Sequence, residues 1–373
     1  MTISSWGQYN VGYRRVSISS LLLLHDGNAM APGVAATLKQ IVPVLDVNLL
    51  DSAQPKAAPA NGAVLCVQLS TIKNFGTFAP RFDISIDGTV IVIPSFSEEY
   101  VAQLNKFGIK NYLVAPAAPN VLISAVSAAR IYVLETGWQD LSPVTRDALV
   151  GSRHSFTQAF ADVRNGGHVD IPEIEAACAL IADCTKESSL SAWLAAIEDH
   201  HDYTYRHCMS VCGAIVHFGH NIGIKADDLT LLSVGGMLHD IGKAWVSLGI
   251  LDKPAKLDDS EQVKMREHPA FSREIMDSME GLDPRVVAMA VHHHEKLDGS
   301  GYPDGLNGDQ LDDLVRLTSI ADIFSALIDE RAYKPAMSYE KAFGIMTSMK
   351  GHLDLDMLAK FEEYAMDARA KTA

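Results

Sequence analysis

Short apolar runs alternate with helix-compatible stretches over the first third of the chain. The apolar runs are bounded by turn residues and are partly β-branched, as buried parallel strands are. The expected strands are residues 18–24, 63–69, 89–93 and 111–116. The expected helices are residues 34–42, 97–107 and 121–134. This alternation predicts an α/β doubly wound parallel sheet in residues 1–135.

Helical signals replace the strand pattern in the rest of the chain. Residues 136–155 contain Ser142-Pro143 and are interpreted as a linker, and residues 156–373 as an all-α domain. Asp227-Asp228 are expected to cap a helix that ends at His239-Asp240, with Gly242 as its stop signal. Prolines at first-turn positions open two further helices, one at residues 268–269 and one at residues 283–284.

Histidines and aspartates recur near helix ends and on helix faces between residues 201 and 335. The set is His207, His239, Asp240, His268, His293, His294 and Asp322. Imidazoles with carboxylates suit first-row metals such as iron, manganese and zinc, whereas calcium and magnesium prefer oxygen. Five histidines and two aspartates exceed the needs of one ion. An aspartate between two histidine-rich halves is suited to bridging two metals.

Asp322 gives independent support for a metal, because it interrupts an apolar helix face at residues 320–324. A carboxylate there is costly to bury unless a positive group meets it. Two other helix residues that could suggest ligands, Cys208 and Cys212, are interpreted as small buried apolar side chains.

The amino-acid composition limits the classes of binding partner and the cellular location that we expect for this protein. The 373 residues carry a net charge of −15, which disfavours broad binding to nucleic acid or to anionic membranes. The five cysteines form no CxxC pair, which fits a reducing cytoplasm. The N-terminus lacks a signal-peptide pattern, and no stretch was expected to approach the roughly 20 apolar residues of a membrane helix. We therefore expect a cytoplasmic protein without nucleic-acid or membrane partners.

Two motifs together are highly specific. "LHDIGK" at 238–243 and "HHEKLDGSGYPDG" at 293–305 resemble the HD superfamily of metal phosphohydrolases and, within it, the HD-GYP family. The resemblance covers about residues 155–350 and includes "DYTYRH" at 202–207, "EHP" at 267–269 and "SIADIFSALIDERAYK" at 319–334. It implies a bacterial phosphodiesterase that hydrolyses cyclic di-GMP to linear pGpG and, in many members, on to GMP.

The resemblance also assigns roles. It implies that the seven histidines and aspartates hold two metal ions, iron or manganese, with Asp240 as the bridge and a catalytic residue. Of the three consecutive histidines, alignment favours His293 and His294 over His292. Tyr203 stands where some members have a glutamate that holds a third metal, so two are expected. Lys243 is expected to donate a hydrogen bond or a proton to phosphate, or to be a helix-end cation.

The expected substrate-binding residues are Tyr302, Arg331 and Lys334, by the same resemblance. The two cations supply the local positive charge that an acidic protein needs to hold a phosphate. One departure from the family is Ser325, which stands where an aspartate is common. The alternatives are a catalytically silent cyclic di-GMP receptor or scaffold, and a phosphohydrolase of another cyclic dinucleotide or nucleotide. Diguanylate cyclases of the GGDEF type, docking through the GYP loop, and a second copy of the chain are possible partners.

The N-terminal third is similar to the response-regulator receiver domains of two-component systems, most clearly in "KFGIKNYLVAPAAPNVLISAVSAAR". It departs from that family where phosphorylation would occur. His25-Asp26 follows the first strand, Gln68 or a neighbour replaces the phosphoacceptor, Pro94 lies near the usual Ser/Thr, and Ala115 replaces a lysine. Receiver chemistry needs clustered carboxylates around magnesium. We therefore expect a degenerate receiver with a dimerisation or docking role.

Overall fold

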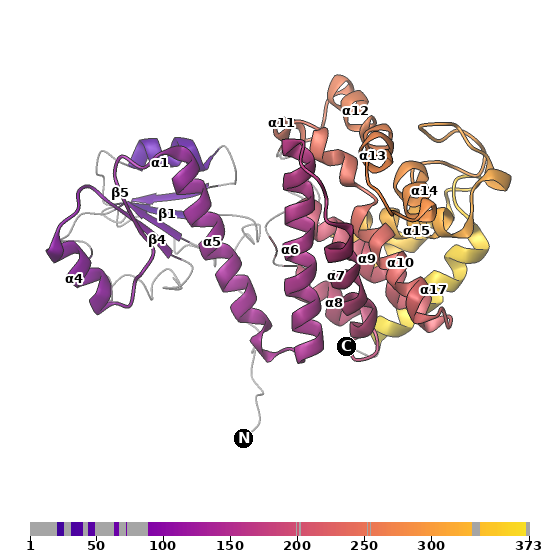
Figure 1. The fold of residues 1–373 in the computed structure, drawn as a ribbon, viewed down its shortest axis with the longest axis horizontal. Coiled ribbons are helices and arrows are strands. Elements are labelled where there is room, and N and C mark those ends of the chain that lie inside the picture. Colours follow the sequence, from indigo (N-terminus) through magenta and orange to yellow (C-terminus); the bar gives the residue numbers. More distant parts are fainter. Residues whose placement is uncertain are drawn as a thin grey trace. The chain divides into compact units, whose positions relative to one another are not determined.

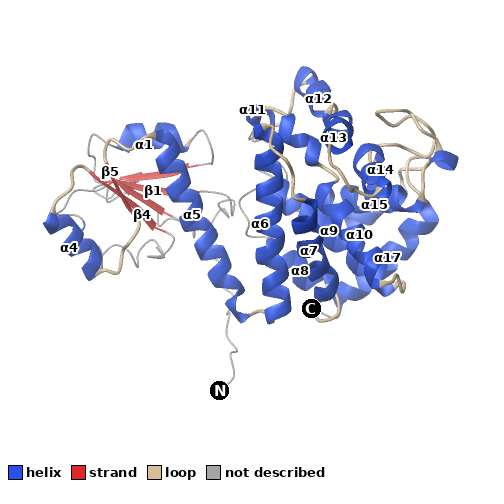
Figure 2. Cartoon of the chain, in the orientation of Figure 1, coloured by secondary structure: helices blue, strands red, loops and turns tan. Residues whose placement is uncertain are grey.

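The protein is described by a computed structural model that covers residues 21–25, 31–39, 44–48, 63–66, 72, 89–198, 200, 203–251, 253, 255–329 and 336–370. The chain divides into two compact units, Met1–Gly137 and Trp138–Ala373 (Figure 1). Strands occur in the first unit, and the described part of the second consists of helices and loops (Figure 2).

The first unit contains a five-stranded parallel sheet with the strand order β2-β1-β3-β4-β5. Its strands are β1 (Leu21–His25), β2 (Val44–Asn48), β3 (Ala63–Cys66), β4 (Thr89–Ile93) and β5 (Tyr112–Val114). Its helices among the described residues are α1 (Ala31–Leu38), α4 (Glu98–Lys106) and α5 (Pro119–Gly137). The sequence pattern missed β2 as a separate strand. All pairs of described strands are parallel, as expected for an α/β sheet, and described helices lie between β1 and β2 and between β4 and β5.

Alternating side chains of the central strands divide the core of this unit into two faces. On one face, Val90 and Val92 of β4 pack in a cluster with Leu122 and Val126 of α5. The intervening Ile91 is also fully buried. Burial on both faces is the reason that these strands are continuously apolar.

Residues 119–140 are long and apolar enough, by length and composition alone, to cross a membrane. The expectation that no stretch approaches this length was therefore wrong. Leu122, Val126 and Ala129 in this segment pack against the sheet, which explains part of its apolar character.

The edge of the sheet where a receiver domain binds phosphate is only partly described. β1 ends at His25, β4 is followed by Pro94, and β5 is followed by Ala115. None of these three residues is a carboxylate. Asp26 and Gln68, the other two positions considered in the sequence, lie outside the described residues.

The second unit is helical. Its α-helices are α6 (Pro143–Asn165), α7 (Ile171–Cys184), α8 (Leu190–Ile197), α9 (Tyr203–Asn221), α10 (Ala226–Leu238), α11 (Leu248–Leu251), α12 (Asp259–Met265), α13 (His268–Asp277), α14 (Pro284–His292), α15 (Asp313–Ile328), α16 (Tyr339–Thr347) and α17 (Leu355–Ala370). Short 3-10 helices are η2 (Trp138–Asp140), η3 (Ile241–Trp245) and η4 (Gly308–Gln310). Helix α9 is buried over most of its length and forms the centre of the unit.

Much of the segment interpreted as a linker belongs to this helical unit. Ser142 is the N-cap of α6, its Oγ accepts a hydrogen bond from the Thr145 amide, and Pro143 occupies the first turn. These are helix-start signals rather than a hinge. Ala148 and Leu149 of α6 are fully buried, so one face of residues 143–155 packs into the core.

Two details at the ends of α10 differ from expectation. Lys225 is the N-cap, and Asp227 and Asp228 lie within the first turn, where carboxylates oppose the positive helix end. At the other end, Gly242 lies inside η3 rather than in a left-handed stop. An added Cβ at Gly242 would meet the His268 carbonyl oxygen at 1.9 Å and the Ser272 amide at 2.6 Å. Gly242 therefore permits the close approach of α13 to η3.

Candidate metal centre

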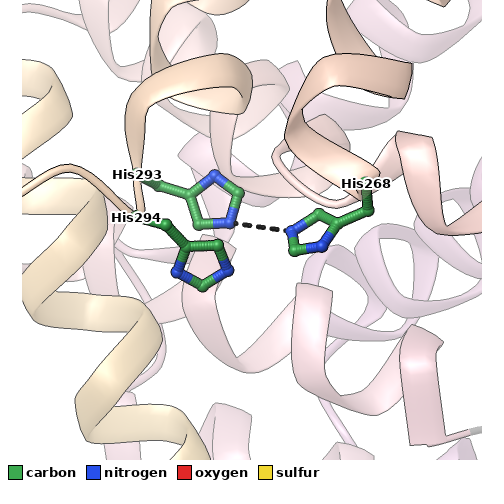
Figure 3. Close-up of side chains that lie close together, drawn as sticks. All are labelled: His268, His293 and His294. Carbon is green, nitrogen blue, oxygen red and sulfur yellow. Dashed lines mark hydrogen bonds between the residues drawn. The ribbon is translucent and has the colours of Figure 1, made fainter. Parts of the chain in front are cut away.

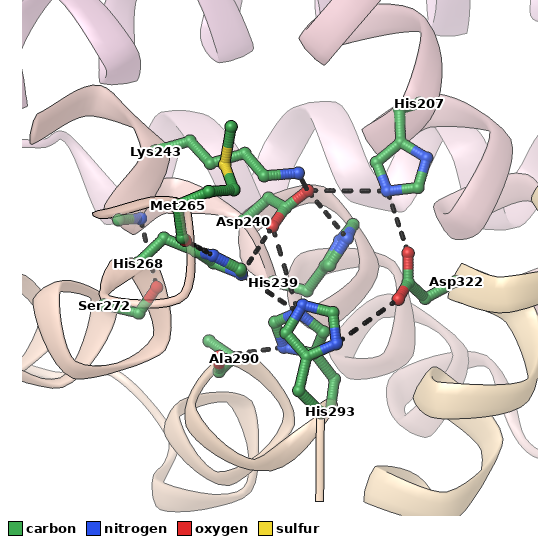
Figure 4. A network of polar contacts seen from close by, with 12 residues as sticks. His207, His239, Asp240, Lys243, Met265, His268, Ser272, Ala290, His293 and Asp322 are labelled. Carbon is green, nitrogen blue, oxygen red and sulfur yellow. Dashed lines mark hydrogen bonds and ion pairs between the residues drawn. The ribbon is translucent and has the colours of Figure 1, made fainter. Parts of the chain in front are cut away.

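The seven histidines and aspartates selected from the sequence lie together in the helical unit; Figure 4 labels six of them and Figure 3 labels His294. They come from the middle of α15, from α9, and from the ends of α10, α13 and α14. All of these backbone positions are in or beside helices, which fixes the directions of the side chains. The structure thus brings together residues that are up to 115 positions apart in the sequence.

Six of the seven side chains form two clusters of three, and Asp240 lies between them. Within each cluster the potential ligand atoms lie within 4.8 Å of one another. The clusters consist of His207, His239 and Asp322, and of His268, His293 and His294. Figure 3 shows the second cluster, in which the Nε2 atoms of His268 and His293 are 3.4 Å apart.

The two carboxylate oxygens of Asp240 face different clusters. Oδ2 lies 3.4 Å from His207 Nε2 and 3.3 Å from His239 Nε2. Oδ1 lies 3.1 Å from His268 Nε2 and 3.8 Å from His293 Nε2. Asp240 is almost completely buried. A carboxylate in this position can contribute one oxygen to each of two neighbouring ions.

The imidazole tautomers support a cation between these groups. Three of the rings donate Nδ1–H to a backbone carbonyl three residues earlier, and each neutral ring then has its lone pair on Nε2. These bonds are His239 to Gly236 (2.8 Å), His268 to Met265 (2.7 Å) and His293 to Ala290 (3.0 Å). In the neutral rings the Nε2 lone pairs therefore point at the Asp240 carboxylate, an arrangement that a positive group in between would stabilise.

Donor spacing fits a metal ion. His239 Nε2 and Asp240 Oδ1 are buried and have no hydrogen-bond partner among the residues that the structure describes. Two ligands bound about 2.1 Å from the same ion are separated by roughly 3 Å, close to the spacings found here. Buried polar atoms without partners are rare in folded proteins. We conclude that the donor set fits first-row divalent metals.

Burial keeps most of the imidazoles neutral, as metal ligands must be. It lowers the pKa of His207, and it lowers the pKa of His294 to about 3. Burial, together with His294 and His239, holds the pKa of His293 well below its ordinary value. His239 differs, because the adjacent Asp240 carboxylate outweighs burial and raises its pKa.

Lys243 contacts the shared carboxylate. Its ammonium donates a hydrogen bond to Asp240 Oδ2 across one turn of η3. Burial would lower the pKa of Lys243, but the charge of Asp240 outweighs it and raises the pKa. Burial likewise opposes ionisation of Asp240, and the Lys243 ammonium overcomes this and holds the pKa of Asp240 well below its usual range. Lys243 is therefore a charged residue that orients Asp240, more than a helix-end cation.

Gly242 and Ser272 place His268 in the centre. The Gly242 amide donates a hydrogen bond to Ser272 Oγ at 3.0 Å. With no Cβ at Gly242, α13 can lie directly against η3, and its first residue, His268, reaches Asp240. The sequence contained this glycine in the "HDIGK" motif, but its contact partner was not readable there.

The three consecutive histidines separate in the structure. His293 and His294 face His268, whereas His292 Nδ1 lies 3.7 Å from Asp304 Oδ2 outside the two clusters. Alignment favoured this choice of two. The neighbouring Cys208 is buried, as expected from the sequence. It also lies close to His239 and Asp240, so it is a neighbour of the candidate metal centre, which the sequence interpretation did not predict.

Glu295 anchors the loop of residues 299–306, which contains Gly301-Tyr302-Pro303 and is called the GYP loop. Glu295 was not identified as a site residue from the sequence. Its buried carboxylate accepts hydrogen bonds from the amides of Asp304, Gly305 and Leu306 at 2.7, 3.0 and 3.2 Å. Gly301 fits against it, because a Cβ there would meet the Glu295 Cα at 2.4 Å. The signal available in the sequence was the position of Glu295 directly after two ligands.

Tyr302 is positioned by this loop beside the metal centre. Its ring stacks on the His294 imidazole with a centroid separation of 4.9 Å. Burial raises the pKa of Tyr302, so its hydroxyl stays protonated at neutral pH. Arg331 and Lys334, the other two expected substrate-binding residues, lie outside the described residues.

Tyr203 and Ser325 lie near the first cluster. The Tyr203 ring is parallel to the His207 imidazole, at 5.9 Å between centroids. Ser325 is fully buried and accepts a hydrogen bond from Ser210 Oγ at 3.1 Å. Ser325 thus joins α15 to α9 without contributing a metal ligand.

Comparison with known proteins agrees with this geometry. The family model of the HD domain matches residues 194–357, which include all seven candidate ligands. These residues are an HD domain. An HD domain implies binding of divalent metal, and the resemblance to the HD-GYP family is confirmed for this part of the chain.

Relatives of the HD domain include phosphodiesterases with two different substrates. A cyclic di-GMP phosphodiesterase of Pseudomonas aeruginosa is 32% identical over 160 residues, 43% of this chain and 39% of that protein. A 3'3'-cGAMP-specific phosphodiesterase of Vibrio cholerae is 38% identical over 164 residues, 44% of this chain and 35% of that protein. The chain therefore spans well under half the length of both.

A solved structure shares the fold. The HDGYP protein Bd1817 of Bdellovibrio bacteriovorus superposes with a TM-score of 0.50 at 16% sequence identity. The match covers 68% of this chain and 89% of that chain. At this identity the likeness concerns the fold alone. It supports the helical architecture of the HD domain.

Proposed function

We propose that this protein is a phosphodiesterase that hydrolyses cyclic di-GMP, to pGpG or to GMP, at a dinuclear iron or manganese centre. The observation that carries the proposal is Asp240, whose two oxygens face two separate clusters of three ligands. A receptor without catalysis would not need both clusters. The relatives that hydrolyse cyclic dinucleotides support the reaction class.

In this proposal the residues of the site have different roles. Metal ions held by the seven ligands would supply Lewis acidity and lower the pKa of water so that a nucleophile is available at neutral pH. Asp240 holds the two halves of the centre at a fixed separation, and Lys243 keeps its carboxylate oriented. Tyr302 offers an aromatic face beside His294 for a base or ribose. Arg331 and Lys334 are proposed to bind the substrate phosphates.

Base selectivity is the point on which the relatives differ. One named relative acts on cyclic di-GMP and another on 3'3'-cGAMP, which replaces one guanine by adenine. Stacking on Tyr302 does not distinguish the two purines, because both present a π face. We propose cyclic di-GMP on the basis of the family resemblance, with 3'3'-cGAMP as the second candidate. Turnover of both substrates by one preparation decides between them.

The first unit is proposed to be a degenerate receiver-like domain with a docking or dimerisation role. Its strand order of β2-β1-β3-β4-β5 is the order of flavodoxin-like doubly wound folds and supports this assignment. His25, Pro94 and Ala115 at the carboxyl edge do not supply carboxylates for magnesium. A cyclase of the GGDEF type and a second copy of this chain are the proposed partners.

The experiment that tests the function is cyclic di-GMP turnover by protein purified without oxygen, with metal counted on the same sample. We expect hydrolysis with about two metals per chain. Asp240→Asn should lose both metal and turnover, whereas Asp277→Asn, an exposed aspartate at the end of α13, should keep both. Tight nucleotide binding without turnover in metal-loaded protein would contradict the proposal and favour a receptor.

A further inference from the structure

Arg266 lies next to Tyr302 at the outer side of the metal centre. It is the C-cap of α12, two residues before the ligand His268. Its guanidinium carbon lies 5.4 Å from the centre of the Tyr302 ring, and that ring stacks on His294. One tyrosine ring therefore connects Arg266 with a metal ligand. Neither sequence motif nor family resemblance singled out Arg266.

Exposure to solvent increases along the row of side chains formed by His294, Tyr302 and Arg266. His293, behind the row, is buried, and the His294 side chain is 26% exposed. Tyr302 is partly buried, and Arg266 is exposed. The row thus leads from the metal ligands to the surface. A ligand too large for the metal centre alone would extend along it.

Charge distinguishes Arg266 from the other cations near the centre. Lys243 is bound to Asp240, Arg273 to Asp304, and Arg206 to Asp329. Within the described ranges Arg266 has no such carboxylate partner, and its guanidinium rests on an aromatic face. A guanidinium presents a planar fork of donors that matches phosphate. Because the chain carries a net charge of −15, an unpaired cation beside the centre matters for an anionic substrate.

We propose that Arg266, in addition to Arg331 and Lys334, binds the phosphate of the cyclic dinucleotide that is not being cleaved. This inference rests on the proposed function. A cyclic dinucleotide carries two phosphodiesters, and when one lies at the metal centre the other must lie outside it. Arg266 is the described cation that is both free of a carboxylate partner and one aromatic ring away from a metal ligand. It is therefore a substrate-binding residue that favours substrates with a second phosphate.

The test compares a substrate with two phosphodiesters with one that has a single phosphodiester. Arg266→Ala and Arg266→Lys are assayed on cyclic di-GMP and on bis(p-nitrophenyl) phosphate. We expect Arg266→Ala to raise KM for cyclic di-GMP about tenfold, the effect of one charge-assisted hydrogen bond at an exposed site. The loss should be confined to the dinucleotide, and Arg266→Lys should recover part of it. Added salt should raise KM more in the parent protein than in Arg266→Ala.

The matched control is Arg369→Ala. Arg369 also lies over a tyrosine ring, with 5.0 Å between its guanidinium carbon and the centroid of Tyr339, but it is on α17 and paired with Glu340. It should leave both substrates unaffected. Equal losses on the two substrates in Arg266→Ala, or an unchanged KM for cyclic di-GMP, would overturn the assignment.

Failure of the proposed function gives a different result. If the parent protein cleaves bis(p-nitrophenyl) phosphate but not cyclic di-GMP, or cleaves neither, equilibrium binding of fluorescent cyclic di-GMP replaces the kinetic assay. Tenfold weaker binding by Arg266→Ala would then uphold the role of Arg266 while refuting hydrolysis. Absence of binding by the parent protein would refute both.

Discussion

The carboxylate of Glu295 offers a sharp test of how the GYP loop is held. Its Oε1 accepts from the amides of Asp304 and Gly305, and its Oε2 accepts from the amide of Leu306. The Glu295→Gln side chain has one carbonyl oxygen, which can accept hydrogen bonds either from the Asp304 and Gly305 amides or from the Leu306 amide. Its NH2 group must then face either the Leu306 amide or the other two, and a donor facing a donor forms no hydrogen bond.

The expected cost follows from the bonds that are changed. A hydrogen bond to a charged group contributes about 1.5–3 kcal/mol, and Glu295→Gln removes one such bond and the charge from the other two. Asp304 and Gly305 are exposed, so water can replace part of what they lose. We therefore expect about 2 kcal/mol of loop stabilisation to be lost in Glu295→Gln, and about 3–4 kcal/mol in Glu295→Ala.

Amide hydrogen exchange of the peptide spanning residues 300–310 measures this loss directly. The loss of about 2 kcal/mol expected in Glu295→Gln corresponds to exchange that is about 30 times faster. Because the loop carries Tyr302, KM for cyclic di-GMP should rise in the same variants. Glu274→Gln on α13, an exposed glutamate, is the matched control. Unchanged exchange in Glu295→Gln would refute the conclusion that this carboxylate anchors the loop.

Two further predictions concern the centre and the core. Lys243→Met removes the donor that orients Asp240, and we expect metal affinity to fall about 10–100-fold, measured by chelator competition; unchanged affinity would contradict the orienting role. His217 is buried and its pKa is lowered to about 4, below the value of about 6.5 in an unfolded chain. The unfolded chain thus binds a proton that the folded protein does not, so stability should decrease as pH falls from about 6.5 to 4, by about 3 kcal/mol from this group. In urea unfolding at several pH values, the free energy of unfolding should depend less on pH in His217→Gln than in the parent protein. The exposed control His220→Gln should behave like the parent protein. The same pH dependence in His217→Gln and the parent protein would contradict the role assigned to His217.

The candidate metal ligands could be selected from the sequence because each is a chemically distinctive residue in a local motif, and the structure places the seven side chains together. His239-Asp240 and His293-His294 lie at helix ends, where neighbouring sequence fixes the direction of the side chain. Asp322 was predicted because a carboxylate on an apolar helix face needs a cation. Local pattern was sufficient in these cases.

Other features depended on contacts between distant segments and could not be read in the same way. Gly242 looked like a helix stop, but its role is set by α13, about 30 residues later in the chain. The hydrogen bonds of Glu295 run to amides 9 to 11 residues away, across a loop whose shape the sequence did not determine. Ser142-Pro143 is different, since its helix-start signal was readable and was interpreted as a hinge.

Because Asp240 lies between two clusters of candidate ligands, the stability of the folded domain should also depend on the concentration of free metal ions. Its ligands come from five helices that are far apart in the sequence, so bound ions would cross-link segments that the unfolded chain leaves separate. Binding to the folded state alone stabilises that state in proportion to the logarithm of the free ion concentration. A chelator should therefore act on this domain as a denaturant, and the lifetime of the protein in a cell should follow the metal that the cell provides.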